Sequence, residues 1–394
     1  MSVRFDSPAN VWQDFFVEDF TGDFDLTKGE VWLNTAHQGA LPRVAADEAR
    51  EAISWKLHPW EMTTERFGSV PSRLRRILGR LIGAPAEEVI LANSSSYGLH
   101  LLANGYPWRS GDEVLLVRDD FPSTILPWLG LERRGVSVRQ IRPRGAVIGV
   151  EDLARNISPA TRVFCTTWVH SFTGYAVDEG LLGSICRDRG VAFVLNASQG
   201  LGARPLDLSG MNVDALTCVG FKWLCGPYGT GFCWIRPALR ESLEYNQAYW
   251  LAMQDADDLG TERELTIRKD LGARRYDIFG TANFFNFKAW TASLEYLLER
   301  GIDRVAGHDN HLVSRFLDGL DRRRFDLLSP RTGSSRSTLI LVSHKDRDRN
   351  VAIHRTLKES GIFAALRRGT IRFSPHLYNT EGEIDRTLEM LSRI

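Results

Sequence analysis

Hydrophobic and polar positions along the chain form two alternating kinds of segment. Short, nearly continuous apolar runs predict strands at residues 89–92, 113–117, 136–141, 163–169, 192–195, 216–219 and 229–235. Between them, apolar residues three and four positions apart predict helices near residues 95–104, 123–134, 151–156 and 180–189. Repeated strand–helix–strand units with such apolar strands indicate an α/β fold, whose mostly parallel sheet lies between helices.

Both ends of the chain depart from this alternation. Residues 1–30 mix polar and aromatic side chains and are expected to form an arm that packs on the small domain. A short strand is predicted at 31–33, followed by helices at 44–56 and 69–82, the second with Pro71 near its start. Beyond a charge-rich linker at 257–277, we expect a smaller α+β lobe with strands near 338–342 and 370–374 and helices at 284–298, 305–320 and 381–393.

Length and charge set limits on what the chain can be. A chain of 394 residues is too long for one hydrophobic core, so two lobes are expected. We assign residues 31–265 to a large domain, and 266–394 to a linker, an interface helix and a small C-terminal domain. The formal net charge is zero. The chain therefore lacks the basic excess typical of proteins that bind nucleic acids or membrane surfaces, and its charge does little to oppose self-association.

Cysteine usage and hydropathy favour a cytoplasmic protein. The five cysteines are odd in number and form no C-x-x-C pair, so neither a disulfide framework nor a zinc site is expected. No apolar run approaches 18 residues, and the N-terminus lacks the apolar core of a signal peptide.

One lysine stands out. Lys222 lies in the stretch 220–231, G-F-K-W-L-C-G-P-Y-G-T-G, between Phe221 and Trp223, although only seven of the 49 Lys and Arg residues are lysines. An apolar pocket lowers the pKa of an amine and frees it to attack a carbonyl, as Schiff-base lysines do. From this stretch alone, a lysine whose stem covers apolar surface is an equally good interpretation.

Polar residues follow the predicted strands, and functional sites of open α/β sheets lie beyond the carboxyl ends of strands. Besides the loop of Lys222, these are N-S-S-S at 93–96, D-D-F-P-S at 119–123, H-S-F-T-G at 170–174 and N-A-S-Q at 196–199. The serines open a helix and can hold a phosphate at its positive end, although simple helix capping explains them too. His37 and His170 could face a substrate or be ordinary buried histidines.

Taken in order, five stretches resemble the class V aminotransferase family of pyridoxal-phosphate enzymes, which includes cysteine desulfurases and isopenicillin-N epimerase. They are L-N-T-A-H-Q-G-A-L-P from Leu33, N-S-S-S-Y-G from Asn93, N-A-S-Q-G-L-G from Asn196, the stretch around Lys222, and I-R-F-S-P-H-L-Y-N-T from Ile371. Each is weak alone, but together they span almost the whole chain. The resemblance implies a fold-type I transferase that binds pyridoxal 5′-phosphate and forms a homodimer with composite active sites.

The resemblance also implies roles for individual residues. Lys222 matches the lysine that forms a Schiff base with the cofactor, and Arg372 the arginine that clamps the substrate α-carboxylate. The residues implied to contact the cofactor are Ser95 and Ser96 at its phosphate, Phe121 on its ring, Gln199 at its phenolic oxygen, and Gly280 and Thr281 at the phosphate of the neighbouring subunit. From the residues alone, Phe121 could be a core aromatic and Arg372 a surface ion pair.

Three departures from the family pattern bear on the chemistry. Asn196 stands where the family has an Asp that keeps the pyridine nitrogen protonated. Val219 and Phe221 replace the phosphate-binding Ser and His before the lysine. No cysteine follows Cys233, so the cysteine nucleophile of the desulfurases is absent and sulfur transfer through a persulfide is disfavoured.

These departures favour reactions that consume a carbanion at once. Asn cannot supply the negative charge that stabilises a pyridinium, so the ring is expected to be a weaker electron sink. We therefore expect a lyase acting on an amino-acid-like substrate, by β-elimination with C–S cleavage or by decarboxylative deamination. An aminotransferase or epimerase acting on an amino acid, and a degenerate member that binds without catalysis, remain as alternatives.

Overall fold

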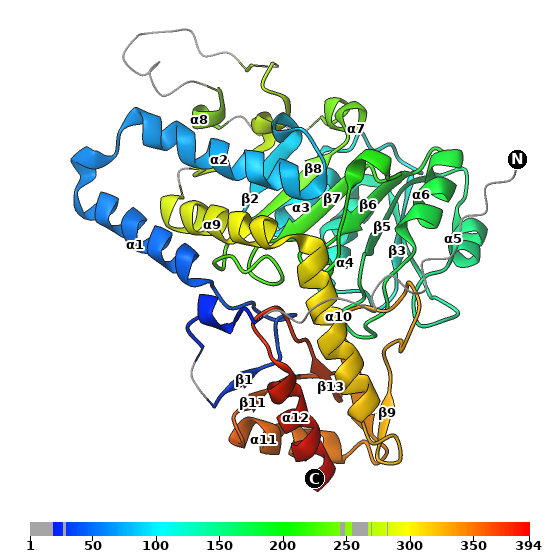
Figure 1. Cartoon of the computed structure of the whole chain (residues 1–394). Coiled ribbons are helices and arrows are strands. Elements are labelled where there is room, and N and C mark those ends of the chain that lie inside the picture. Colours follow the sequence, from blue (N-terminus) through cyan, green and yellow to red (C-terminus); the bar gives the residue numbers. More distant parts are fainter. Residues whose placement is uncertain (1–18, 27–28, 245–248, 254–266, 269, 282) are drawn as a thin grey trace, which may run out of the picture.

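The computed structural model describes residues 19–26, 29–244, 249–253, 267–268, 270–281 and 283–394 (Figure 1). Residues 1–18 of the expected arm, and much of the linker expected at 257–277, lie outside these ranges. Two aromatic residues of the arm are buried. The ring of Phe20 meets His308 edge-on at 5.5 Å, and Phe24 meets Tyr378 at 5.1 Å.

A seven-stranded sheet forms the centre of the larger lobe in the described part of the chain. Its order is β2-β8-β7-β6-β5-β3-β4, and its pairs are parallel except for the two that β8 makes. The strands are β2 (Val89–Ala92), β3 (Glu113–Val117), β4 (Ser137–Ile141), β5 (Thr161–Thr167), β6 (Ala192–Asn196), β7 (Ala215–Val219) and β8 (Gly231–Ile235). The predicted α/β fold with a mostly parallel sheet is confirmed.

Helices cover both faces of this sheet. Successive strand residues point to opposite sides, and here both sides carry apolar residues. On β3, Leu115 and Val117 enter one hydrophobic core, whereas Val114 and Leu116 enter another. The first core is closed by α1 (Arg43–Leu57), α2 (Thr64–Ile82), α5 (Val150–Asn156), α6 (Glu179–Asp188) and α9 (Phe284–Arg300). The second is closed by α3 (Ser95–Gly105) and α4 (Pro122–Leu129), and the short helices α7 (Pro237–Glu241) and α8 (Trp250–Met253) follow β8.

The smaller lobe is built on a four-stranded antiparallel sheet of order β12-β13-β10-β9 (Figure 1). Its strands are β9 (Phe325–Leu327), β10 (Ile340–His344), β12 (Ala365–Arg367) and β13 (Thr370–Phe373), and its helices are α10 (Ile302–Gly319), α11 (Arg349–Glu359) and α12 (Glu381–Arg393). Near the N-terminus, β1 (Val31–Trp32) pairs in parallel with β11 (Ile362–Phe363). The first described strand therefore lies against the last part of the chain, and the predicted division at residue 265 stays a prediction.

Some element limits differ from the prediction for local reasons. Helix α2 begins at Thr64 because the side chain of Thr63 accepts a hydrogen bond from the N–H of Arg66, so Pro71 lies inside the helix. Strand β5 ends at Thr167 rather than at residue 169, because the chain turns back there and Val169 bridges Ala176. The helix predicted at 123–134 ends at residue 129 and continues as a 3-10 turn.

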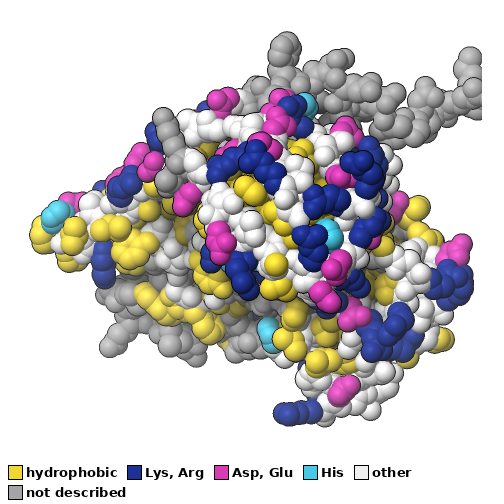
Figure 2. Space-filling view, turned by 90° about the horizontal axis from the view of Figure 1, so that it is seen from below, with side chains coloured by type: hydrophobic (Ala, Val, Ile, Leu, Met, Phe, Trp, Pro, Cys, Tyr) yellow, Lys and Arg dark blue, Asp and Glu magenta, His cyan; other side chains and the backbone are white. Residues whose placement is uncertain are grey.

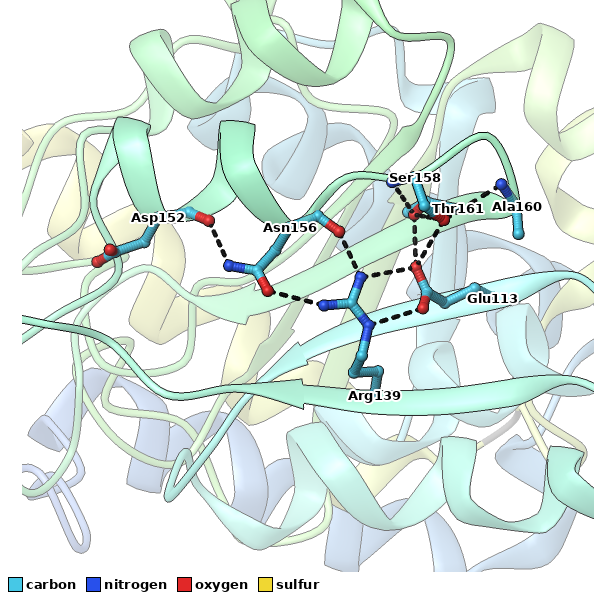
Figure 3. Close-up of polar contacts among 7 residues, drawn as sticks. All are labelled: Glu113, Arg139, Asp152, Asn156, Ser158, Ala160 and Thr161. Carbon is cyan, nitrogen blue, oxygen red and sulfur yellow. Dashed lines mark hydrogen bonds and ion pairs between the residues drawn. The ribbon is translucent and has the colours of Figure 1, made fainter.

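A polar cluster lies toward the amino-terminal ends of β3 and β5 (Figure 3). Arg139 donates hydrogen bonds to both carboxylate oxygens of Glu113, at 2.7 and 3.1 Å, and to Oδ1 of Asn156 at 2.7 Å. Burial alone would raise the pKa of Glu113, but Arg139 and Thr161 outweigh it and hold the pKa below its usual value. The cluster ties the edge strand β4 to its neighbours at the end of the sheet remote from the candidate site. None of the described helices is long and apolar enough to cross a membrane.

Candidate active site

The carboxyl ends of the parallel strands meet at one edge of the large sheet. Because β8 is antiparallel to both β2 and β7, those two strands run in the same direction and end at the same edge. The polar loops predicted from the sequence follow there, carrying Ser95 after β2, Phe121 after β3, His170 after β5 and Lys222 after β7, with Asn196 ending β6. The fold thus gathers loops that lie far apart in the sequence.

Lys222 is buried between aromatic rings. Its side chain is 9% exposed, and its Nζ lies 5.4 Å from the ring centroid of Phe121 and 5.8 Å from that of Phe221. Burial, followed by the positive charges of Arg372 and Arg367, lowers the pKa of Lys222 to about 8. A substantial part of this amine is therefore neutral near physiological pH and can attack a carbonyl, which argues against a stem that only covers surface.

The backbone around Lys222 is fixed by close packing. The N–H of Gly39 donates to the carbonyl of Phe221 at 2.9 Å, and a Cβ on Gly39 would lie 2.1 Å from the carbonyl oxygen of Lys222. The indole of Trp223 donates to Oε1 of Gln199 at 3.0 Å. Only glycine at position 39 therefore allows the N-terminal loop to approach the lysine this closely.

The predicted phosphate loop is the N-terminus of α3. Ser94, rather than Ser95 or Ser96, caps this helix by accepting a hydrogen bond from the N–H of Tyr97 at 3.3 Å. Ser95 is buried and Ser96 is half-buried in the first turn. Their first-turn N–H groups lack helical partners and are aimed toward this edge.

Phe121 is partly exposed, as expected of a side chain that stacks on the ring of a cofactor. It is 36% exposed and stacks on Phe172, with ring centroids 6.2 Å apart and ring planes 25° apart. Asp120, which the sequence did not single out, holds the start of this loop. Its carboxylate accepts from the N–H of Phe121 at 2.6 Å and from the N–H and hydroxyl of Thr167 at 2.9 and 2.8 Å. Burial raises the pKa of Asp120, and these donors oppose that shift.

His170 and His37 differ in their surroundings. His170 is buried, with Nδ1 3.0 Å from the hydroxyl of Thr173 and Nε2 3.3 Å from the carbonyl of Asp119. Burial lowers its pKa, although Asp120 acts in the opposite direction. The exposed His37 has its pKa lowered by partial burial and then by nearby positive charges, those of Arg367, Arg372 and Lys222. His37 therefore lies at the cationic side of the site.

Asn196 and Gln199 are committed to neutral partners. The amide of Asn196 donates to the hydroxyl of Thr124 at 3.1 Å, and its Oδ1 accepts from the N–H of Ser198 at 3.2 Å. Gln199 donates to the carbonyl of Ala36 at 2.9 Å. Asn196 thus contributes no negative charge at the position where, by the resemblance noted above, the family has an Asp.

Arg372 lies on β13 and reaches the site from the smaller lobe. It is 2% exposed and donates to the carbonyl of Ser171 at 3.2 Å, while its Nε has no hydrogen-bond partner among the described residues. Burial, and then the charge of Arg367, lowers its pKa to about 9. Arg372 is therefore not part of a surface ion pair, which its residue type alone would have allowed. Its buried guanidinium can bind an anion.

Gly280 and Thr281 lie in the segment before α9. Gly280 has a left-handed φ of 76°, and Thr281 is buried. Their predicted role at the phosphate of a neighbouring subunit stays a prediction, since a single chain is described. Within the described residues, no cluster of three or more His, Cys, Asp or Glu side chains could hold a metal ion.

Comparisons with known proteins agree with this architecture. The family model Aminotransferase class-V matches residues 61–387. The chain is 25% identical to a probable cysteine desulfurase of Methanothermobacter thermautotrophicus, covering 96% of this chain and 98% of that protein. It is 26% identical to isopenicillin N epimerase of Streptomyces clavuligerus, with 96% and 98% covered.

Solved structures show the same fold. A C-DES variant with glycine covalently linked to its pyridoxal-phosphate cofactor superposes with a TM-score of 0.86 at 19% identity, covering 95% of this chain and 99% of that one. The cystine C–S lyase C-DES with its product cysteine persulfide gives 0.84 at 20% identity, covering 93% and 98%.

The fold and the site define a pyridoxal-phosphate-dependent enzyme of fold type I. The chain belongs to the class V aminotransferase family, as the sequence-based resemblance predicted. Its residues fit the cofactor: besides the buried amine of Lys222, Oγ of Ser198 and Nε of Arg372 are buried without partners among the described residues. Such atoms are those a bound molecule would satisfy.

Proposed function

We propose that this enzyme is a lyase that acts on the α-amino group of an amino-acid-like substrate and eliminates a sulfur group from Cβ. The observation that supports this reaction is Asn196, whose amide faces only the neutral partners Thr124 and Ser198. Asp120 provides a carboxylate at the same edge, but its oxygens accept hydrogen bonds from Phe121 and Thr167. Without an anion at position 196, a carbanion at Cα is short-lived, which favours immediate loss of a leaving group.

The chain's own residues divide the work. Bound pyridoxal phosphate supplies a carbonyl for imine formation and a ring that withdraws electrons from Cα. Arg372 binds the α-carboxylate and fixes the orientation of Cα. The amine of Lys222, whose pKa is lowered to about 8, would hold the cofactor and take up the Cα proton of the substrate. Phe121 and Phe172 stack on each other and provide an apolar wall on one side of the site.

The proposal also covers how two copies of the chain assemble and where the protein is located. Large apolar side chains are exposed on the larger lobe, among them Leu57, Trp60, Tyr228, Phe279 and Phe285. We propose that a second copy of the chain covers them, forming a homodimer in which Gly280 and Thr281 reach the neighbouring phosphate site. The five cysteines are free and buried, and we propose a cytoplasmic location.

The reaction can be tested with cysteine S-conjugates that differ in leaving group. A lyase releases pyruvate, ammonia and the thiol in equal amounts without a second substrate. Lys222→Ala should abolish release, while the exposed-surface variant Arg355→Gln should not. Absence of both thiol and pyruvate across the panel would refute the lyase. Amino-group transfer that requires an α-keto acid acceptor would instead identify an aminotransferase.

A further inference from the structure

Two arginines lie on the same face of the hairpin that β12 and β13 form. In this antiparallel pair, Ala365 is opposite Arg372 and Arg367 is opposite Thr370. Opposed residues share a face, and so do residues two apart on one strand. Arg367 and Arg372 are therefore diagonal neighbours on one face, with backbones roughly 7–8 Å apart.

This face is turned toward the loops of the site, because Arg372 donates from it to the carbonyl of Ser171 in the loop after β5. The positive charges of Arg367 and Arg372 both act on Lys222 and on His37, and Arg367 also lowers the pKa of Arg372. Positive charges act on one another in this way when the groups share a partly desolvated space, which agrees with the register of the hairpin. Arg367, which is half-buried, thus belongs to the site, although no motif pointed to it.

The charges of this cluster are not balanced within the chain. Across the described ranges, neither Arg367 nor Arg372 has a carboxylate within ion-pair distance; Arg367 donates to the carbonyl of Leu366 and Arg372 to that of Ser171. Cations on the outside of the same lobe differ. Basic and acidic side chains lie side by side there (Figure 2), as in the pairs Arg315–Asp385 and Lys345–Asp326.

The turn that carries Arg367 is held in place. Arg368 has a left-handed φ of 48°, its guanidinium lies 4.0 Å from the ring centroid of Phe172, and it pairs with Asp119 at 3.8 Å. A non-glycine residue in this conformation persists only where its surroundings hold it. Because Phe172 also stacks on Phe121, the turn packs against these two rings, and Arg367 is held beside the site.

We propose that Arg367 determines substrate specificity by binding a second anionic group, carried on the side chain of the substrate, while Arg372 binds the α-carboxylate. The substrate class is then α-amino acids with an acidic group at the far end of the side chain, such as a carboxylate or sulfonate. Two unneutralised guanidinium groups on one face match two anions joined by a short chain. This inference deepens the proposed function and rests on it for the amine that reaches Lys222.

Binding can be measured without the reaction by using acids that have no amine. Calorimetric titrations of the holoenzyme would compare succinate, glutarate and adipate with butanoate, pentanoate and hexanoate, which replace one carboxylate by a methyl group. At least one diacid should bind about tenfold or more tightly than its matched monoacid, since a charged hydrogen bond is worth roughly that factor. Arg367→Gln should remove the preference, weaken monoacid binding far less than diacid binding and keep the melting temperature.

Further variants separate this role from others. Arg367→Lys should retain part of the preference because the charge is kept, Arg372→Gln should weaken both classes of acid, and Arg355→Gln should change nothing. Equal binding of diacids and monoacids by the natural enzyme would overturn the proposal, as would a loss of monoacid affinity in Arg367→Gln equal to that of the diacid. Because no bond is broken, these results stand even if the enzyme proves not to be a lyase.

Discussion

The imidazole Nδ1 of His376 lies 2.7 Å from Oδ2 of Asp309, and both side chains are completely buried. Asp309 comes from α10, whereas His376 follows β13, and its Nε2 lies 3.1 Å from the carbonyl of Trp223, the residue next to Lys222. With an acceptor at each nitrogen, the ring carries both protons. Burial by itself would lower the pKa of His376, but the carboxylate of Asp309 outweighs it and the pKa rises to about 10. The smaller lobe is thereby joined to the lysine loop by the hydrogen bond of His376 to Trp223, and the buried Asp309 holds this imidazole in place.

Removing one partner of this pair should destabilise the protein strongly. Asp309→Asn leaves a buried imidazolium without its counter-ion, so we expect the free energy of unfolding to fall by about 3–5 kcal/mol. Chemical denaturation would measure the change. Asp385→Asn, which breaks the exposed pair with Arg315, is the matched control and should cost less than about 1 kcal/mol. Similar losses for the two variants would contradict a special role for the buried pair.

The same pair predicts a dependence of stability on pH. The pKa of His376 is higher in the folded than in the unfolded chain, so its contribution is complete below about pH 6.5. It is lost progressively as the pH rises toward 10. Lys222 acts in the opposite sense, because its folded pKa is lowered and stability is gained as pH rises through its titration. We therefore expect the difference in melting temperature between the natural protein and His376→Gln to shrink from pH 6.5 to 10; a constant difference would refute this assignment.

Much of the architecture follows from local patterns. The runs 89–92 and 113–117, which are apolar except for Glu113 at the start of the second, match β2 and β3 residue for residue, because strands buried on both faces are almost entirely apolar. The order of strand and turn also placed Lys222, Phe121 and Asn196 at one edge, since parallel strands end together. β8 is antiparallel, but it lies between β2 and β7, so those two strands still end at the same edge.

Other parts depend on contacts between distant segments. Asp309 looks like an ordinary polar residue of an amphipathic helix, and only the packing of α10 on the segment after β13 brings it to His376. Arg367 is one of many arginines until the register of β12 and β13 places it beside Arg372. Side-chain partners across elements are set by this register and packing, which one sequence does not reveal.

The pKa of Lys222 can be measured by chemical labelling of the protein stripped of cofactor. Reductive methylation at increasing pH, followed by mass spectrometry of the peptide with Lys222, should give half-maximal reaction near pH 8, because only the neutral amine reacts. The peptide with the exposed Lys358 serves as an internal reference for reagent decay. Arg372→Gln removes the charge that follows burial in importance, so the midpoint should move up. A midpoint above pH 10 in the natural protein would show that the amine is not perturbed.

Asn196→Asp tests whether the missing charge directs the reaction. The new carboxylate can keep the hydrogen bond from the N–H of Ser198, and the hydroxyl of Thr124 can turn to donate to it, so the fold should tolerate the change. A negative charge at the pyridine nitrogen stabilises its protonated form and strengthens the electron sink. We expect the absorption band of the bound cofactor to shift, and the ratio of elimination to amino-group transfer to fall roughly tenfold, a change of about 1.4 kcal/mol in relative barriers. Asn104→Asp on the exposed end of α3 adds the same charge away from the ring and should alter neither quantity. If Asn196→Asp leaves both the spectrum and the ratio of products unchanged, the weaker electron sink does not explain the chemistry of this enzyme.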